Sequence, residues 1–244
     1  MDENSAIEID EKPEIESDFQ YSSEKSLISQ GAEARLFRCC YLGKDAILKE
    51  RFVKNYRHSE LDRHLTKERI RNESRSILKC KQVGIDVPTI YFLNTETNGI
   101  IFEFIEGLTA KDFIEKTRSE VDKESFERIM QTLGYNIGQV IGKLHSSGIS
   151  HGDLTTSNMI LRQSDPARVC LIDFGLAASR INHEDFGVDL YVLERAIRTT
   201  HVGIDFFMDK ILEGYASAQW KGSKEALKKL NEVRLRGRKR EMIG

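Results

Sequence analysis

Hydrophobic and polar positions divide the chain into a strand-rich first part and a helical second part. In residues 25–48, apolar pairs alternate with polar residues and are interrupted by Gly31 and by a Gly-Lys-Asp turn. Short alternating runs bounded by turn residues are typical of β-strands. Residues 58–82 are predicted as a charged helix, and 87–93 and 100–105 as two further strands. The first part is therefore expected to be a small antiparallel sheet that carries one helix.

The second part changes to the three- and four-residue spacing of an amphipathic helix. The spacing predicts one long helix that ends near Gly148, with these apolar positions: Phe126, Ile129, Met130, Leu133, Ile137, Ile141 and Leu144. Residues 159–161 and 169–172 are predicted as short strands, and the chain from Leu190 onward as mostly helical. The fold class expected is α+β, with an antiparallel-sheet lobe, a helical lobe and a cleft between them.

Four segments are expected along the chain. They are an acidic and disordered tail at 1–24, an N-lobe at 25–105, a C-lobe at 106–232 and a basic tail at 233–244. The net charge of −2 conceals an uneven distribution of charge along the chain. Residues 1–19 hold eight acids and one lysine, so the rest of the chain is basic. A basic helix region and a basic tail together favour a surface that faces RNA or an acidic partner.

Composition predicts a soluble globular protein, and without an apolar stretch near the N-terminus neither secretion nor a membrane anchor is expected. Hydrophobic residues make up 39% and charged residues 31% of the chain, and no window resembles the roughly 18 apolar residues of a membrane span. The four cysteines form no C-x-x-C pair. Reduced thiols, a location in cytoplasm or nucleus, and no zinc site are expected.

The most specific chemical signal is His151-Gly152-Asp153-Leu154-Thr155-Thr156-Ser157-Asn158, which is followed by Asp173-Phe174-Gly175. This is the spacing of the protein-kinase pattern H-x-D-L-x-x-x-x-N and D-F-G. Phosphoryl transfer needs a carboxylate that orients the attacking group and further ligands that hold Mg²⁺ against the nucleotide phosphates. Asp153 is predicted for the first role, and Asn158 with Asp173 for the second.

A lysine and a glutamate complete the expected nucleotide site. Lys49 follows an apolar run, as the strand lysine of kinases does. Glu73 lies between Ile70 and Ile77 at helical spacing, so its carboxylate is expected to point inward. An inward carboxylate needs a cation, and Lys49 is the predicted partner.

The loop over the phosphates and the hinge give weaker signals. Kinase loops use several glycines, whereas this chain offers Gly31 together with the small residues Ala32 and Ala34. Backbone groups of Glu103 and Ile105 are predicted, from topology alone, to meet the edge of the adenine.

Two departures from ordinary protein kinases narrow the function. Gly152 replaces the arginine of His-Arg-Asp, so no guanidinium is available there to bind a phosphorylated activation loop. Only fifteen residues separate Asp173 from Asp189, and no Ala-Pro-Glu follows. That is too short for a phosphorylation-switched loop and a peptide-docking platform. Asp189 is predicted to cap the helix beneath the catalytic turn.

Four motifs resemble those of the atypical serine/threonine kinase family of the KEOPS complex (also called EKC), the PRPK family. They are the loop 30–34, the motif 151–158, the segment 188–194 and the ending 233–240. The resemblance implies a reduced bilobal protein-kinase-like fold, and ATP and Mg²⁺ as cofactors. It also implies an ATPase that supports threonylcarbamoyladenosine (t6A) formation on tRNA, with serine/threonine kinase activity on protein.

The same resemblance implies site roles and partners. Asp153 would be the catalytic acid/base, Asn158 and Asp173 would hold Mg²⁺, and Lys49 and Glu73 would clamp the phosphates. The partners implied are the catalytic and regulatory subunits of the complex, with the basic tail serving tRNA or the catalytic subunit.

Two alternatives stay open at the level of sequence. His-Gly-Asp also occurs in small-molecule kinases of the aminoglycoside or choline type, but only about 70 residues follow Asp173 here. Such enzymes usually carry large substrate-binding insertions in that region. A catalytically silent scaffold is the other alternative, and it is motivated by the glycine-poor loop.

Overall fold

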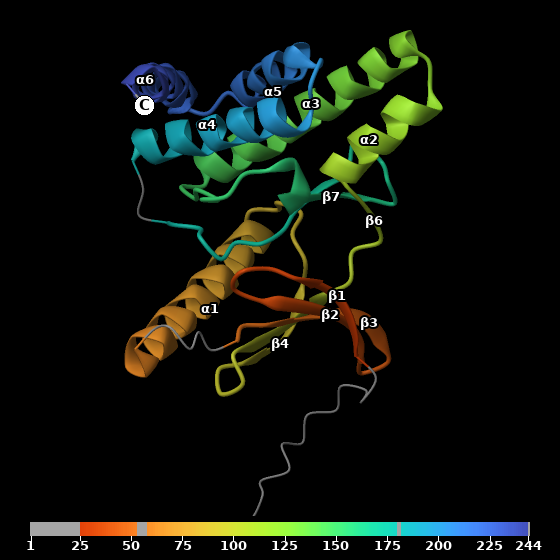
Figure 1. Ribbon diagram of the computed structural model, residues 1–244, viewed down its shortest axis with the longest axis vertical. Helices are drawn as coiled ribbons and strands as arrows, with labels where there is room; N and C mark the ends of the chain where they lie inside the picture. Colours follow the sequence, from red (N-terminus) through yellow and green to blue (C-terminus); the bar gives the residue numbers. More distant parts are fainter. Residues whose placement is uncertain (1–24, 53–57, 180–181, 244) are drawn as a thin grey trace, which may run out of the picture.

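A five-stranded antiparallel sheet forms the first lobe. The computed structural model describes residues 25–52, 58–179 and 182–243; the predicted acidic tail at 1–24 lies outside these residues. The strand order is β1-β2-β3-β5-β4, and this sheet lies in the lower half of Figure 1. The strands are β1 (Ser26–Gln30), β2 (Arg35–Tyr41), β3 (Lys44–Glu50), β4 (Ile90–Asn94) and β5 (Gly99–Glu103).

The sheet packs its two faces differently because strand side chains alternate. Ala46 and Leu48 of β3 belong to a small cluster on one face. On the other face Ile47, together with Ile100, joins the large core that also contains residues of helix α1 (Ser59–Gln82). Lys49 continues the alternation of Ile47, so it points toward α1. The predicted helix at 58–82 and the small antiparallel sheet are confirmed.

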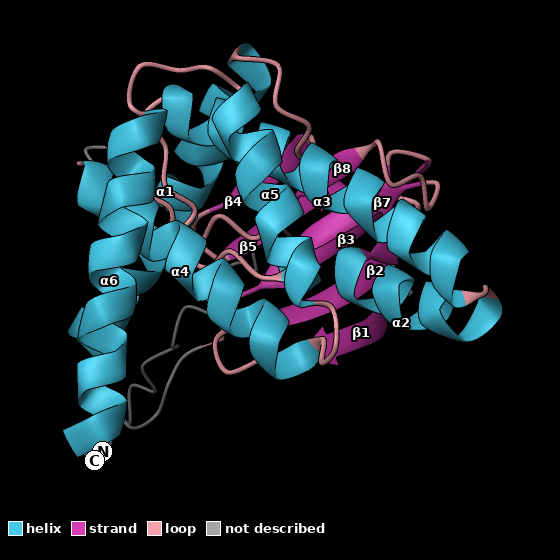
Figure 2. Ribbon diagram, turned by 90° about the horizontal axis from the view of Figure 1, so that it is seen from above, coloured by secondary structure: helices cyan, strands magenta, loops and turns pink. Residues whose placement is uncertain are grey.

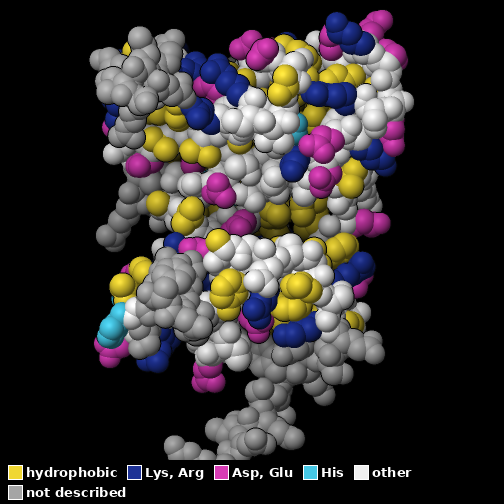
Figure 3. All heavy atoms as spheres, viewed as in Figure 1, with side chains coloured by type: hydrophobic (Ala, Val, Ile, Leu, Met, Phe, Trp, Pro, Cys, Tyr) yellow, Lys and Arg dark blue, Asp and Glu magenta, His cyan; other side chains and the backbone are white. Residues whose placement is uncertain are grey.

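The second lobe is helical and is built around α3 (Lys123–Ser146). It holds a three-stranded sheet, β6 (Gly107–Thr109), β7 (Met159–Arg162) and β8 (Val169–Leu171), and the helices α2 (Ala110–Glu120), α4 (His183–Thr200), α5 (Asp205–Ser217) and α6 (Ser223–Ile243). Figure 2, seen from above, shows α3 and α5 in front of the strands and α6 at the left edge. The two lobes meet at an indentation at mid-height in the space-filling view (Figure 3).

Close helix packing holds this lobe together. A Cβ at Gly138 of α3 would lie 2.0 Å from the backbone oxygen of Ile211 in α5, so only glycine allows this approach. The long helix predicted from apolar spacing is confirmed, and it ends at Ser146, two residues before Gly148. The α+β class, with a sheet lobe and a helical lobe, is confirmed as well.

Two expected element boundaries differ from those observed. The strand predicted from residue 87 begins only at Ile90, since Pro88 has no N–H to donate to a neighbouring strand. Residues 233–243, predicted as a basic tail, continue helix α6, because Val233 is buried on the apolar face of that helix. No helix among the described residues is long and apolar enough to cross a bilayer.

Candidate functional site

The catalytic turn is a short loop that is held together by the side-chain amide of Asn158. Asn158 ends a single 3-10 turn (Thr156–Asn158), and its Nδ2 lies 2.9 Å from the backbone oxygen of Asp153 and 3.0 Å from Asp153 Oδ2. The amide therefore donates both N–H groups to Asp153. The carboxylate is fixed in direction, and the amide oxygen of Asn158 is left as an acceptor.

Asp189 anchors the turn from below. Its Oδ2 accepts a 2.6 Å hydrogen bond from the His151 N–H, and its Oδ1 accepts a 2.8 Å bond from the Gly152 N–H. The prediction that Asp189 caps a helix was wrong. Helix α4 begins at His183 with Asn182 as its cap, and Asp189 lies buried in its second turn. The spacing of a cap and the spacing of a buried interior carboxylate are indistinguishable in the sequence.

Two buried histidines complete this support. His145 Nε2 lies 3.3 Å from Asp189 Oδ2, and its Nδ1 lies 3.0 Å from the hydroxyl of Tyr215. His151 Nε2 donates to the backbone oxygen of Ile172, 2.9 Å away. Burial lowers the pKa of both imidazoles, and the charge of Asp189 opposes that shift only in part. Both histidines are therefore neutral and serve as hydrogen-bonding supports.

Asp173 faces the N-lobe across the cleft and meets Lys49. Its backbone is left-handed, with φ +60°, which turns the carboxylate out of the strand direction. Lys49 Nζ lies 2.7 Å from Asp173 Oδ1 and 2.7 Å from Glu73 Oε1. Lys49 and Glu73 are both buried, as the inward glutamate predicted. The expected Lys49–Glu73 pair is present.

Electrostatics keep Asp173 ionised. Burial by itself would raise the pKa of its carboxyl. The charge and hydrogen bond of Lys49, with the N–H of Gly175 and the charge of Arg51, outweigh burial and hold the pKa below its ordinary value. The carboxylate is therefore available as an anionic metal ligand at neutral pH.

Arg51 belongs to the site and was missed in the sequence. Its Nη2 donates to Glu73 Oε2 at 2.8 Å, so Glu73 joins two cations, one on each carboxylate oxygen. A signal was present, because residues two apart in an extended strand share a face. Arg51 therefore follows Lys49 on the side that faces α1.

The loop between β1 and β2 lies beside Lys49 and Arg51 and contains a single glycine, Gly31. The Gly31 N–H donates to the Ala34 oxygen at 2.9 Å, so the turn is closed on itself. Glu33 at its tip contacts Arg69 of α1, and its Oε2 lies 3.7 Å from Arg51 Nη1. The loop is thereby tied to α1 through Arg69 and lies near Arg51 at the end of β3.

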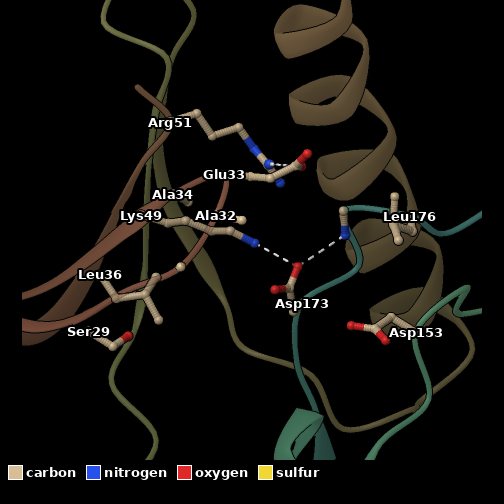
Figure 4. Close-up of a pocket in the computed structure, with 12 residues that line it drawn as sticks. Ser29, Ala32, Glu33, Ala34, Leu36, Lys49, Arg51, Asp153, Asp173 and Leu176 are labelled. Atoms are coloured by element: carbon tan, nitrogen blue, oxygen red, sulfur yellow. Dashed lines mark hydrogen bonds and ion pairs between the residues drawn. The ribbon is translucent and has the colours of Figure 1, made fainter. Parts of the chain in front are cut away.

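These residues line a cavity of about 390 Å³ between the lobes (Figure 4). The predicted site residues Gly31, Ala32, Lys49, Asp153 and Asp173 are brought together in its wall. Glu73 lies behind Lys49, and Asn158 lies behind Asp153.

The predicted hinge contacts stay a prediction. The Glu103 N–H donates to the Thr89 oxygen at 2.8 Å, and Ile105 is buried at the start of the connection between the lobes. Neither residue is among those that line the cavity. The Glu103 carboxylate instead accepts a 2.7 Å bond from Arg162 of β7, so its side chain joins the two lobes.

The donor set fits Mg²⁺ bound together with a nucleotide. Within the described ranges no three His, Cys, Asp or Glu side chains are grouped to hold a metal ion. Magnesium commonly takes one or two protein oxygens and completes its shell with water and substrate phosphates. The Asp173 carboxylate and the amide oxygen of Asn158 are the oxygens that would hold it.

Solved structures with this fold are kinase-like. A structure described as WaaP in complex with acyl carrier protein aligns with a TM-score of 0.61 at 16% identity, over 90% of this chain and 88% of that one. The BubR1 kinase domain aligns with a TM-score of 0.53 at 19% identity, over 73% and 61% of the two chains. The reduced bilobal kinase-like fold is therefore confirmed.

Sequence relatives are more specific. The family model described as lipopolysaccharide kinase (Kdo/WaaP) family matches residues 28–221. EKC/KEOPS complex subunit Tp53rkb of Mus musculus is 42% identical over 89% of this chain and 88% of its own length. EKC/KEOPS complex subunit bud32 of Dictyostelium discoideum is 44% identical over 89% and 84% of the two chains, and that of Aspergillus oryzae is 41% identical over 90% and 92%. The chain therefore belongs to the Kdo/WaaP kinase family and, at closer range, to the EKC/KEOPS subunit family of Bud32 and Tp53rkb.

Proposed function

We propose that this protein is an ATP-dependent phosphotransferase with ATPase activity that acts as the kinase subunit of an EKC/KEOPS complex and supports t6A modification of tRNA. One observation carries the proposal. Lys49 bridges Glu73 and Asp173 at 2.7 Å each, in the cavity that Asp153 also lines. This is the set of groups that positions phosphates and a metal ion in kinases. The complex is inferred from the names of the relatives.

The residues divide the chemistry between them. Lys49 donates to phosphate oxygens and is aligned by Glu73. Asp173 and Asn158 would hold Mg²⁺, which would supply positive charge against the phosphates. Asp153 accepts the proton of the attacking hydroxyl or water, and its carboxylate is kept in direction by the 3.0 Å bond from Asn158. Phosphoryl transfer depends mainly on such positioning.

Water or a serine or threonine of a neighbouring subunit is the proposed acceptor. Helix α4 begins at His183, ten residues after Asp173, so little chain is available to form a platform for peptides. Leu176 lines the cavity and is 56% exposed. Its side chain offers a small apolar contact to an acceptor group that approaches Asp153.

The end of α6 is the proposed contact for tRNA or for the catalytic subunit. Arg234 and Arg236 are engaged with Glu194 and Glu184 at 2.6 and 2.8 Å. The run that follows Gly237, residues 238–240, is Arg-Lys-Arg. Three basic residues in succession suit phosphate binding. Cytoplasm and nucleus are the proposed locations, where tRNA is present and thiols stay reduced.

ATP turnover by the full chain tests the proposal. It is measured for the chain alone and then with the other EKC/KEOPS subunits and tRNA, in the presence of Mg²⁺. Turnover is expected to disappear in Asp153→Ala while circular dichroism stays unchanged. Hydrolysis at the wild-type rate by that variant would contradict the assignment.

Two further outcomes distinguish the alternatives. ATP consumption driven by one metabolite, with no partner protein present, would favour a small-molecule kinase. Full rescue of tRNA modification by Asp153→Ala would favour a scaffold.

A further inference from the structure

Arg51 lies in the cavity wall with N–H donors that find no acceptor among the described residues. Its side chain is 6% exposed, and Nη2 makes the 2.8 Å bond to Glu73 Oε2. Its Nη1 is 3.7 Å from Glu33 Oε2, which is too far for a hydrogen bond. Its Nε is buried and has no partner in the described part of the chain. A guanidinium has five N–H donors, and buried donors without an acceptor are rare.

The guanidinium lies in the cavity wall, between the buried Glu73 and the opening. Arg51, Lys49 and Asp173 lie around the same opening, with Arg51 beside the loop that carries Glu33 (Figure 4). A Cβ at Gly175 would lie 2.7 Å from Arg51 Nη2. The absence of a side chain at Gly175 therefore leaves room for the guanidinium above Asp173.

The carboxylates around the cavity leave too little positive charge for a bound polyphosphate unless a second cation takes part. The Lys49 ammonium is shared by two carboxylates, those of Glu73 and Asp173. The loop adds the negative charge of Glu33, and its Gly31 N–H is already donated to Ala34. A glycine-rich loop would supply several backbone N–H groups to phosphates, whereas this loop has few glycines. Lys49 alone is thus a weak counter-charge for a polyphosphate.

We infer that Arg51 is a second phosphate-binding residue, whose guanidinium donates hydrogen bonds to the phosphate oxygens of the nucleotide beside Lys49. Its Nη1 group, which lies too far from Glu33 for a hydrogen bond, would donate to the phosphate oxygens, while Nη2 stays bonded to Glu73. Glu33 and Glu73 hold the guanidinium in the wall from two sides. The inference rests on the proposed function, because it requires a nucleotide in this cavity.

Calorimetric binding to the full chain tests the role, with Mg-ATP, Mg-ADP and adenosine as probes. Arg51→Gln keeps a polar, though shorter, side chain and removes its charge. It is expected to weaken Mg-ATP and Mg-ADP about tenfold to a hundredfold, which is the range of a lost charge-assisted pair. Adenosine, which lacks phosphates, is expected to bind within about twofold of the wild type.

Arg69→Gln is the matched control. Arg69 also contacts Glu33, but it does not line the cavity, so its loss should change neither Mg-ATP nor adenosine binding by more than about twofold. Arg51→Lys keeps a positive charge beside Glu73 but replaces the planar guanidinium by an ammonium group. An intermediate loss of Mg-ATP affinity is expected. This variant serves as the test if Arg51→Gln does not fold.

A double-variant comparison separates phosphate binding from an indirect role through Glu73. In a Glu73→Gln background, Arg51→Gln should still weaken Mg-ATP at least about fivefold. No further loss in that background would reduce Arg51 to a positioning residue and overturn the inference. Equal losses of adenosine and Mg-ATP in Arg51→Gln would overturn it too.

Failure of the proposed function gives a different result. If the wild type binds no Mg-ATP, or if Lys49→Ala binds it as the wild type does, the nucleotide site itself is refuted. If Lys49→Ala loses affinity and Arg51→Gln and Arg51→Lys do not, only the role of Arg51 is refuted.

Discussion

The amide of Asn158 donates to both the backbone oxygen and the carboxylate of Asp153, at 2.9 and 3.0 Å. One side chain thus aligns the proposed base and leaves its own amide oxygen as the proposed metal ligand. The two functions need different atoms of the amide. A substitution can therefore remove one of them while retaining the other.

Asn158→Asp is expected to reduce ATP turnover at least about a hundredfold. The new carboxylate keeps a metal-binding oxygen, but it replaces the N–H donors with an acceptor that repels Asp153. Turnover measured as a function of Mg²⁺ concentration should stay low even at saturating metal. Recovery at high Mg²⁺ would show that Asn158 acts as a metal ligand alone.

Removal of Glu73 is expected to destabilise the fold as well as the site. Glu73→Ala leaves two buried cations, Lys49 and Arg51, without their shared carboxylate. Breaking a buried pair by removing one partner costs about 3–5 kcal/mol. Urea denaturation measures the free energy of unfolding, and Glu232→Ala, which removes a partner of Lys229 on the surface, is the control. A loss no larger than that of the control would argue against a buried network.

Position 152 requires glycine because of its backbone conformation and a close contact. This requirement is separate from the loss of the arginine found there in ordinary protein kinases. Gly152 has φ +82°, and a Cβ would lie 2.4 Å from the backbone oxygen of Leu176. Gly152→Ala is expected to displace the segment around Leu176 and lower ATP turnover at least about tenfold, with about 1–3 kcal/mol less stability. Gly203→Ala is a matched control, because Gly203 has φ +83° and a Cβ there would meet no atom within 4 Å.

The comparison of these two glycine variants separates strain from contact. Both should lose stability through the positive φ, and only Gly152→Ala should lose turnover. Equal turnover in the two variants would contradict a close contact at the catalytic turn.

Acid is expected to destabilise the folded state, starting near pH 6.5. Burial holds the pKa values of His145 and His151 below the ordinary value of 6.5. As the pH falls through 6.5 the unfolded histidines bind protons and the folded ones do not, so the free energy of unfolding decreases. The depressed pKa of Asp173 acts in the same direction at lower pH, because protonation removes its pairing with Lys49.

Urea denaturation at pH 8.0, 6.5 and 5.5 measures this dependence. His145→Gln removes one buried imidazole and should flatten the profile between pH 6.5 and 5.5. His64→Gln, at an exposed position, should leave the profile as in the wild type. A wild type equally stable at all three pH values would contradict the prediction.

The basic end of the chain is expected to have a structural part and a binding part. Arg234 Nε lies 2.6 Å from Oε2 of the buried Glu194, so Arg234→Ala should cost about 1–3 kcal/mol. A triple substitution of residues 238–240 to glutamine should instead weaken tRNA binding and its salt dependence, with little change in stability. Filter binding at 50 and 200 mM salt measures the difference. Unchanged affinity in the triple variant would leave this end as a contact for protein.

Local spacing made much of the fold and site predictable. Helix α1, helix α3 and the short strands around the catalytic turn follow from periodicity that a single segment displays. Asp153, Asn158 and Asp173 lie within one stretch, and Lys49 and Glu73 each carry a local signature. Arg51 and Glu33 escaped notice because a charged residue looks alike in sequence whether it faces a cavity or water.

The amino-acid sequence by itself determined the lobes, the kinase-like chemistry and the family resemblance, since each depends on residues that are neighbours along the chain or on one face of one element. Only the tertiary structure decided which groups Asp189 and Arg51 contact and that residues 233–243 continue a helix. Asp189 binds backbone 37 and 38 residues away, and Arg51 gains its place from α1 and Gly175. Such contacts depend on how separate elements pack against one another. Residue type and spacing do not show which charged side chains become buried in that packing.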